Sequence, residues 1–411
     1  MKSKTDTDSR PLLEIIQADS ERMLNHTIEW SRVNTHSLNP DGIRRLSGMV
    51  SEAFAPLASR ISSIELPDLI EIDSRGRQQH TPLAPCLAIQ GPRRLHALRL
   101  LFMIHLDTVY PSDGGFDSVQ RREGGILHGP GVADAKGGMA VIHQVLSAIE
   151  QSPLAARIEW QVFLNTDEEL GSPGSMPLMP ELARSADFGL LYEPALPDGS
   201  LIANRKGSGN FTLLIKGRAA HAGREFFAGR SAIHLAAQAV VQLAEMSSAA
   251  NGTTINVGSI DGGGPVNVVA DIAVVRFNAR VRSLAAMHQV QSELQALTNQ
   301  LNANDGFTAQ LFGEFSSPPK LVDQKTAALL QLAQGCATTL GIPLELKDSG
   351  GVCDGNKLLA GGLPNIDTLG VRGRDIHSHN EIMWVDSLVE RAQLSLLLVE
   401  SLVRHKEERH A

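Results

Sequence analysis

Imidazoles and carboxylates follow several apolar stretches of this chain, at the points where those stretches end. Such ends carry His105, Asp107, Glu168, Glu169 and Glu193. Related residues are Asp134, in a glycine-lined loop before a helix, and His377 and His379, far downstream in GRDIHSHNE. Histidine nitrogens and carboxylate oxygens are ligands that zinc and similar divalent cations accept. Two histidines and three carboxylates, with no thiolate among them, suit two cations bridged by one carboxylate. Paired metal ions about 3.5 Å apart can hydrolyse substrates.

The first two of these residues close an apolar run, LRLLFMIHLDTVY, at residues 98–110. Side chains two positions apart in an extended segment point to the same face, so His105 and Asp107 can converge on one point. A metal ligand and the carboxylate that orients it are often arranged in this way.

No single residue of the set is informative by itself. A lone histidine at a strand end more often caps a loop or packs in the core, and DEE is usually a solvated loop. The joint occurrence at successive strand ends changes the interpretation, because clustered carboxylates repel one another unless a cation neutralises them.

Strand-like and helix-like stretches alternate over LRLLFMIHL, GGMAVIHQVLSAIEQ, RIEWQVFLNT and DFGLLYEP. This order predicts an α/β domain with a mixed, largely parallel sheet flanked by helices. Ligands of such sheets gather beyond the carboxyl ends of the strands, where the polar residues above would lie.

A different pattern begins after NRKGSG, residues 204–209, and reads βαββαβ. It ends at SSPPK, residues 316–320, which we interpret as a hinge or linker. We therefore expect a ferredoxin-like domain at residues 207–320, inserted into a discontinuous domain formed by residues 1–206 and 321–411.

Composition narrows the class of protein. A chain of 411 residues favours two domains, and a net charge of −8 argues against a nucleic-acid partner. The N-terminus is polar and no run is long and apolar enough to span a membrane, so we expect a cytoplasmic protein. Three widely spaced cysteines indicate reduced thiols.

Several motifs together resemble the di-zinc glutamate carboxypeptidase and N-acyl-amino-acid deacylase superfamily. They are HLDTV, GPGVADAKGG, NTDEELGSPGS, LLYEPA, GRAAHAG, SGGVCDGN and HSHNE, in the expected order. The likeness is closest to bacterial glutamate carboxypeptidases, whose sequences also read DTVY and NTDEE. It extends over nearly the whole chain, including the inserted lid and dimerisation domain.

The resemblance implies two zinc ions per subunit, with cobalt or manganese as possible substitutes. The implied ligands are His105 and Glu193 for one ion, Glu169 and His377 for the other, and Asp134 as the bridge. The family pattern H-S-x-N-E selects His377, but His379 stays open because it stands two positions away.

Further roles follow from the same resemblance. Glu168 would be the general base, and Asp107 would orient the ring of His105. Asn267 and Arg280 of the lid would hold a substrate carboxylate, since the planar fork of arginine matches that group.

Gly350 and Gly351 would contact the same substrate carboxylate through their backbone. His221 would reach the active site of the other subunit and stabilise the oxyanion, which requires a homodimer through the lid.

The predicted function is a zinc-dependent amidohydrolase or carboxypeptidase that releases a free amino acid, acidic ones included, from an N-acyl or peptide conjugate. The alternative is a deacylase of the acetylornithine or succinyl-diaminopimelate type. A third hypothesis, a catalytically inactive metal-binding protein, is disfavoured because Glu168 and all implied ligands are present.

Overall fold

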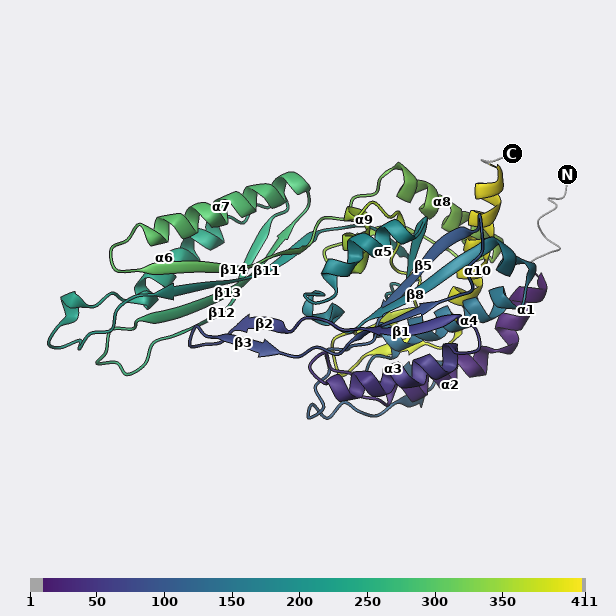
Figure 1. Ribbon diagram of the computed structural model, residues 1–411, viewed down its shortest axis with the longest axis horizontal. Helices are drawn as coiled ribbons and strands as arrows, with labels where there is room; N and C mark the ends of the chain where they lie inside the picture. Colours follow the sequence, from purple (N-terminus) through teal and green to yellow (C-terminus); the bar gives the residue numbers. More distant parts are fainter. Residues whose placement is uncertain (1–9, 409–411) are drawn as a thin grey trace.

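The apolar run that ends at His105 forms the middle of a six-stranded mixed sheet. The computed structural model describes residues 10–408, and strand β5 (Leu98–His105) pairs in parallel with β8 on one side and β9 on the other (Figure 1). The order is β1-β4-β8-β5-β9-β16, with antiparallel pairs at the β1 and β4 edge. The remaining strands are β1 (Arg60–Ile64), β4 (Cys86–Gln90), β8 (Ile158–Asn165), β9 (Phe188–Leu191) and β16 (Asn365–Ile366). The mixed α/β class predicted from the sequence is confirmed.

Both faces of this sheet are covered by helices, which explains why β5 is almost continuously apolar. Leu100 and Phe102 pack into the main core, whereas Leu101 and Met103 pack on the opposite face. The helices of this large domain are α1 (Arg10–Ala18), α2 (Ser20–Ser31), α3 (Pro40–Phe54), α4 (Gly138–Glu150), α5 (Met179–Ser185), α8 (Gln324–Thr339), α9 (Asp354–Ala360) and α10 (Asp386–Glu408).

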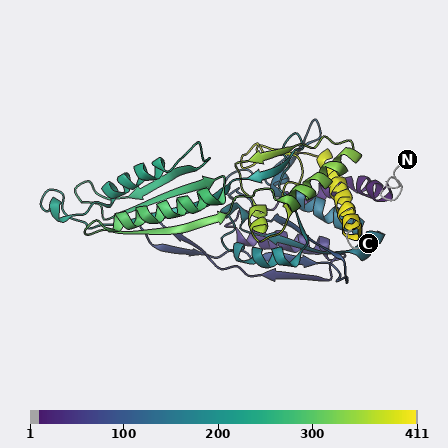
Figure 2. The ribbon, with the colours of Figure 1, turned by 90° about the horizontal axis from the view of Figure 1, so that it is seen from above.

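Residues 207–317 form a second unit, which we call the small domain. It contains a four-stranded antiparallel sheet and two helices. Its elements are β11 (Gly207–Lys216), α6 (Ala232–Glu245), β12 (Thr254–Gly262), β13 (Ile272–Val281), α7 (Leu284–Asn302) and β14 (Thr308–Ser317). The strand order is β12-β13-β11-β14, and α6 and α7 share one core with the sheet. Figures 1 and 2 show this unit extending away from the large domain. The βαββαβ order matches the sequence pattern. The expected linker SSPPK is shorter than predicted, because its first two residues, Ser316 and Ser317, belong to β14.

Shorter strands complete the chain. They are the hairpin β2 (Leu69–Ile72) and β3 (Gln78–Thr81), the parallel pair β10 (Leu201–Arg205) and β15 (Leu346–Ser349), and the sheet of β6 (Gln120–Arg122), β7 (Ile126–His128), β17 (Gly373–Arg374) and β18 (Ile382–Trp384). Among residues 10–408, no helix combines the length and the apolar character needed to cross a bilayer.

The two connections between the domains are joined to each other. Arg205 and Lys320 exchange backbone hydrogen bonds of 2.9 and 3.0 Å. Both side chains also bind Asp367, at 2.9 Å from the guanidinium and 2.7 Å from the Lys320 Nζ. Burial alone would raise the pKa of Asp367, but the two cations hold it well below its usual range. One buried carboxylate therefore fixes the entry to the small domain and the exit from it.

We predict that Asp367→Asn lowers the free energy of unfolding by about 3–5 kcal/mol, because it leaves two buried cations without their partner. The matched control is Asp305→Asn, which removes an exposed ion pair with Arg230 and should cost less than about 1 kcal/mol. Urea denaturation measures both values. Equal losses in the two variants would contradict the assignment.

Candidate metal centre

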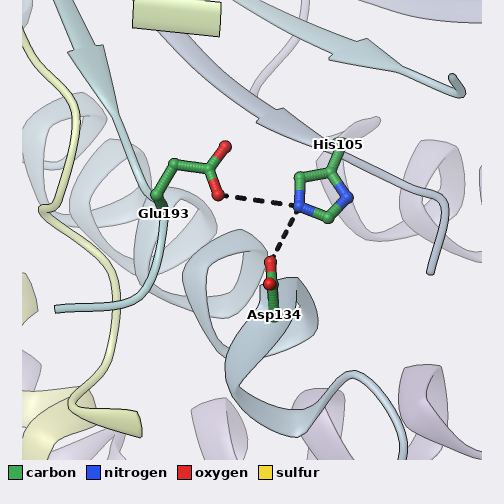
Figure 3. Close-up of side chains that lie close together, drawn as sticks. All are labelled: His105, Asp134 and Glu193. Atoms are coloured by element: carbon green, nitrogen blue, oxygen red, sulfur yellow. Dashed lines mark hydrogen bonds and ion pairs between the residues drawn. The ribbon is translucent and has the colours of Figure 1, made fainter. Parts of the chain in front are cut away.

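The structure brings five of the predicted residues into two overlapping clusters. His105, Asp134 and Glu193 form the first, and Asp134, Glu169 and His377 form the second. Within each cluster one potential ligand atom per residue lies within 4.8 Å of the others. Figure 3 shows the side chains of the first cluster pointing toward one another. Asp134 belongs to both clusters, as a bridging carboxylate would.

The distances within the clusters are short. The His105 Nε2 atom lies 2.9 Å from the Asp134 Oδ1 atom and 3.7 Å from the Glu193 Oε2 atom. The His377 Nε2 atom lies 3.3 Å from the Asp134 Oδ2 atom and 3.2 Å from the Glu169 Oε2 atom. The two imidazoles thus face opposite oxygens of one carboxylate.

Each ligand candidate stands just beyond a strand or on a connecting loop. His105 ends β5, Glu169 follows β8, and Glu193 follows β9. Asp134 lies in the turn before α4, and its peptide bond to Ala135 is cis. His377 lies between β17 and β18 with a φ of 62°, a conformation that residues other than glycine adopt mainly where their surroundings enforce it.

Asp107 connects two of these elements. Its buried carboxylate accepts hydrogen bonds from the backbone N–H groups of Glu168 and Glu169, at 3.2 and 3.1 Å, and from the Ser37 hydroxyl at 2.7 Å. The His105 Nδ1 atom lies 2.9 Å from the Asp107 backbone oxygen and 3.5 Å from its carboxylate. Because β5 ends at His105, Asp107 lies beyond the strand, and its main-chain carbonyl makes the shorter contact with the ring.

Glu381 is a residue of this site that the sequence interpretation missed. Its carboxylate accepts hydrogen bonds from the backbone N–H groups of Gly131, Ala133 and Asp134 at 2.9–3.0 Å, and from the Tyr110 hydroxyl at 2.6 Å. It therefore holds the loop that presents Asp134. Its position as the last residue of the HSHNE motif was the signal in the sequence that could have indicated this role.

The protonation equilibria reflect crowded carboxylates. Burial and the nearby Glu193 and Asp354 carboxylates raise the pKa of Glu168 well above its usual range. Burial raises the pKa of Glu169 to about 7. Hydrogen bonds to Asp134 and Glu169 raise the pKa of His377 to about 11. Such shifts are the expected effect of burying carboxylates beside one another, and a divalent cation bound among them would oppose these shifts.

Glu168 is half-buried beside the first cluster and is bound to Asp107 through its backbone. His379 lies apart from both clusters: its ring stacks on Phe116 with centroids 5.2 Å apart, and its carbonyl is 2.9 Å from the His128 Nε2 atom. The geometry therefore places His377, and not His379, beside Asp134 and Glu169.

The predicted site residues of the small domain lie in two separate places. Arg280 reaches the large domain, where its Nη1 atom donates to the Gly350 oxygen at 2.7 Å. A side chain at Gly350 would project into open space, so packing within the protein does not require glycine there. His221 and Asn267 are exposed and lie beside each other, linked by the Ala222 N–H donating to the Asn267 oxygen at 2.9 Å.

Comparisons with known proteins indicate the family to which the chain belongs. The model of Peptidase family M20/M25/M40 matches residues 101–401. Carboxypeptidase G2 from Pseudomonas sp. strain RS-16 is 31% identical over 315 residues, 74% of each chain. A succinyl-diaminopimelate desuccinylase from Pseudoalteromonas translucida is 25% identical over 296 residues, 68% of this chain and 76% of that protein.

The structure of a tripeptidase from Staphylococcus aureus shares the fold, with a TM-score of 0.72 at 24% identity over 94% of this chain and 99% of that one. The sequence matches define a metal-dependent hydrolase of amide bonds. Among such enzymes, the chain belongs to peptidase family M20/M25/M40, whose model matches most of its length. The resemblance inferred from the motifs is confirmed.

We predict that Glu381→Gln weakens zinc binding about tenfold, because an amide cannot accept all four hydrogen bonds that fix the Asp134 loop. Competition with a chelator measures the affinity. Glu345→Gln, at an exposed position of the same domain, is the matched control and should bind zinc as the unmodified protein does. Unchanged affinity in Glu381→Gln would show that the loop holds Asp134 without this carboxylate.

Proposed function

We propose that the two clusters bind two zinc ions, with cobalt or manganese as possible substitutes. The proposed ligands are His105, Asp134, Glu193, Glu169 and His377, with Asp134 shared by both ions. The observation that carries the proposal is that two three-residue clusters share one carboxylate. Their donors are nitrogen and oxygen atoms without a thiolate, which suits divalent cations of the zinc type.

The chemistry is amide hydrolysis. Cations at such a site supply Lewis acidity, which lowers the pKa of water and polarises a carbonyl oxygen. Glu168 acts as the general base: its carboxylate accepts a proton from the attacking water and returns it to the departing amine nitrogen. Asp107 positions Glu168 and Glu169 through their backbone N–H groups, and it orients the ring of His105.

The proposed substrate is an N-acyl or peptide conjugate that releases an amino acid with a free carboxylate, acidic amino acids included. Arg280 binds that carboxylate, together with the backbone of Gly350 and Gly351. Asn267 lies beside His221, so it would reach the same carboxylate only together with His221, from the other subunit of a dimer. The contact between Arg280 and Gly350 supports this assignment, because it places the guanidinium beside an open loop of the large domain. The similarity to desuccinylases supports the alternative, removal of a small acyl group from an amino acid.

The small domain, within residues 207–320, is proposed to be a lid and a dimerisation domain. His221 would act in the active site of the other subunit of a homodimer, which its exposed position supports. We also propose a cytoplasmic location, because three free cysteines suit a reducing compartment.

A hydrolysis panel tests the function. Zinc-loaded protein is assayed against N-acetyl and N-succinyl amino acids, benzoyl- and folyl-glutamate conjugates, and dipeptides. We expect turnover of a conjugate that releases a free amino acid, and a kcat about 10²- to 10⁴-fold lower in Glu168→Gln with both metals retained. Glu181→Gln, an exposed glutamate on α5, is the control and should be fully active.

Three results would change this proposal. Absence of turnover on every amide, with two metals bound, would favour a metal-binding protein without catalysis. Loss of metal from Glu168→Gln would make Glu168 a ligand and not the base. Activity restricted to acetyl or succinyl substrates would favour the deacylase alternative.

Subunit mixing tests the role of His221. His221→Ala and Glu168→Ala should each be nearly inactive, and a mixed dimer should contain one site with both residues intact. With random pairing, half of the dimers are mixed, so activity should recover to about a quarter of the unmodified rate. If no activity returns although subunits demonstrably exchange, His221 does not act across the dimer.

A further inference from the structure

The hairpin β2–β3 leaves the large domain and lies against the sheet of the small domain (Figure 1). It covers the sheet face that is opposite α6 and α7. Ile72 of the hairpin is 6% exposed and packs with Leu214 and Val274 in a cluster of its own. The small domain is therefore held by a third segment of the large domain, besides its two covalent connections.

Consecutive apolar residues in the small-domain strands show that both sheet faces are covered. On β11, Leu213 packs with the helices, whereas Leu214 packs with the hairpin. On β13, Val275 and Val274 divide in the same way. Adjacent residues of a strand point to opposite faces, so Leu214 and Val274 would be exposed without the hairpin.

Polar contacts and shape fix the hairpin in place. The Arg276 Nη2 atom donates to the Ile72 carbonyl at 2.6 Å, while the Nη1 atom pairs with Asp261 of β12. At the turn, Gly76 has a φ of 70°, and an added Cβ atom would lie 2.6 Å from a methyl group of Leu214. The turn therefore sits directly on the sheet, and its positive φ favours glycine.

The same face of β13 also carries the arginine that reaches the large domain. Val274, Arg276 and Arg280 are separated by even numbers of residues, so they share one face of the strand. Val274 and Arg276 contact the hairpin, and Arg280 binds the Gly350 carbonyl. The hairpin thus contacts the same face of β13 from which the Arg280 side chain extends.

We propose that the hairpin, residues 69–81, is a positioning element for substrate recognition. By holding β13 against the large domain, it keeps the Arg280 guanidinium at the loop that contains Gly350 and Gly351. Without it, the small domain would keep its two connections, the Arg280 contact, the hydrogen bond from Lys206 to the Gly252 carbonyl and the packing of β14 beside α9, but it would lose the contact on the face of β13. This inference rests on the proposed substrate role of Arg280.

The test variant is Ile72→Glu, which places a carboxylate in the contact between hairpin and sheet without entering the core of either domain. The matched control is Ile70→Glu on the same strand, where the side chain is 58% exposed. We expect the amides of residues 69–81 to exchange hydrogen about tenfold faster in Ile72→Glu than in the control. Unchanged exchange would overturn the proposal. Arg276→Met, which removes only the polar contact, is the second variant if Ile72→Glu does not fold, and it should show the same change.

Kinetics then test the consequence for substrate binding. With the conjugate that the panel shows to be cleaved fastest, KM should rise about fivefold in Ile72→Glu, with kcat within about twofold and metal content unchanged. In an Arg280→Met background the same substitution should add no further increase, because both act through one guanidinium.

The two proposals fail in different ways. An unchanged KM in Arg280→Met would overturn the substrate role of Arg280, and the positioning role with it. A raised KM in Arg280→Met but not in Ile72→Glu would overturn the hairpin proposal alone. Independent, additive effects of the two substitutions would also overturn it, because the hairpin would then act elsewhere.

Discussion

Carboxylates that are crowded together and removed from water repel one another, and the large domain is organised around keeping several of them in place. Asp134, Glu169 and Glu193 lie within two clusters that also contain two imidazoles. Two further carboxylates hold the backbone around them: Asp107 binds the N–H groups of the loop after β8, and Glu381 binds those of the loop before α4. Hydrogen bonds from Asp107 and Glu381 thus fix the positions of the clustered carboxylates. Cations bound at the proposed sites would relieve the repulsion among these carboxylates.

The chemistry and the recognition of substrate are assigned to different parts of the chain. The side chains proposed to bind metal stand at or near the carboxyl edge of a sheet whose two faces are both buried, which provides a rigid support. Arg280 belongs to the small domain. The two connections between this domain and the large domain are both bound by Asp367, through Arg205 and Lys320. A site divided in this way depends on the orientation of the small domain, and the hairpin packed against β13 supplies a restraint on that orientation.

The sequence predicted those features that follow from local periodicity. The strand-end candidates His105, Glu169 and Glu193, the βαββαβ order and the positions of β5, β8 and β9 could be read from the sequence, because each apolar run is continuous and the polar residue follows it closely. His377 lies far downstream and was selected through the family motif. Glu381 was not predicted as part of the site, since its partners are backbone groups about 250 residues away in the chain. The hairpin was missed because β2 and β3 are short, and only Ile72 of β2 is buried. For the same reason the burial of Leu214 by that hairpin was not predicted. The adjacent leucines in FTLLIKG were nevertheless a signal that both faces of the small-domain sheet are covered.

The most direct test of the account is a crystal structure of the zinc-loaded protein, with anomalous diffraction measured on both sides of the zinc absorption edge. We expect two peaks per subunit about 3.5 Å apart, on either side of the Asp134 carboxylate. One peak should contact His105 and Glu193, and the other should contact Glu169 and His377. A single peak, or a second ion bound by His379, would contradict a two-metal centre bridged by Asp134.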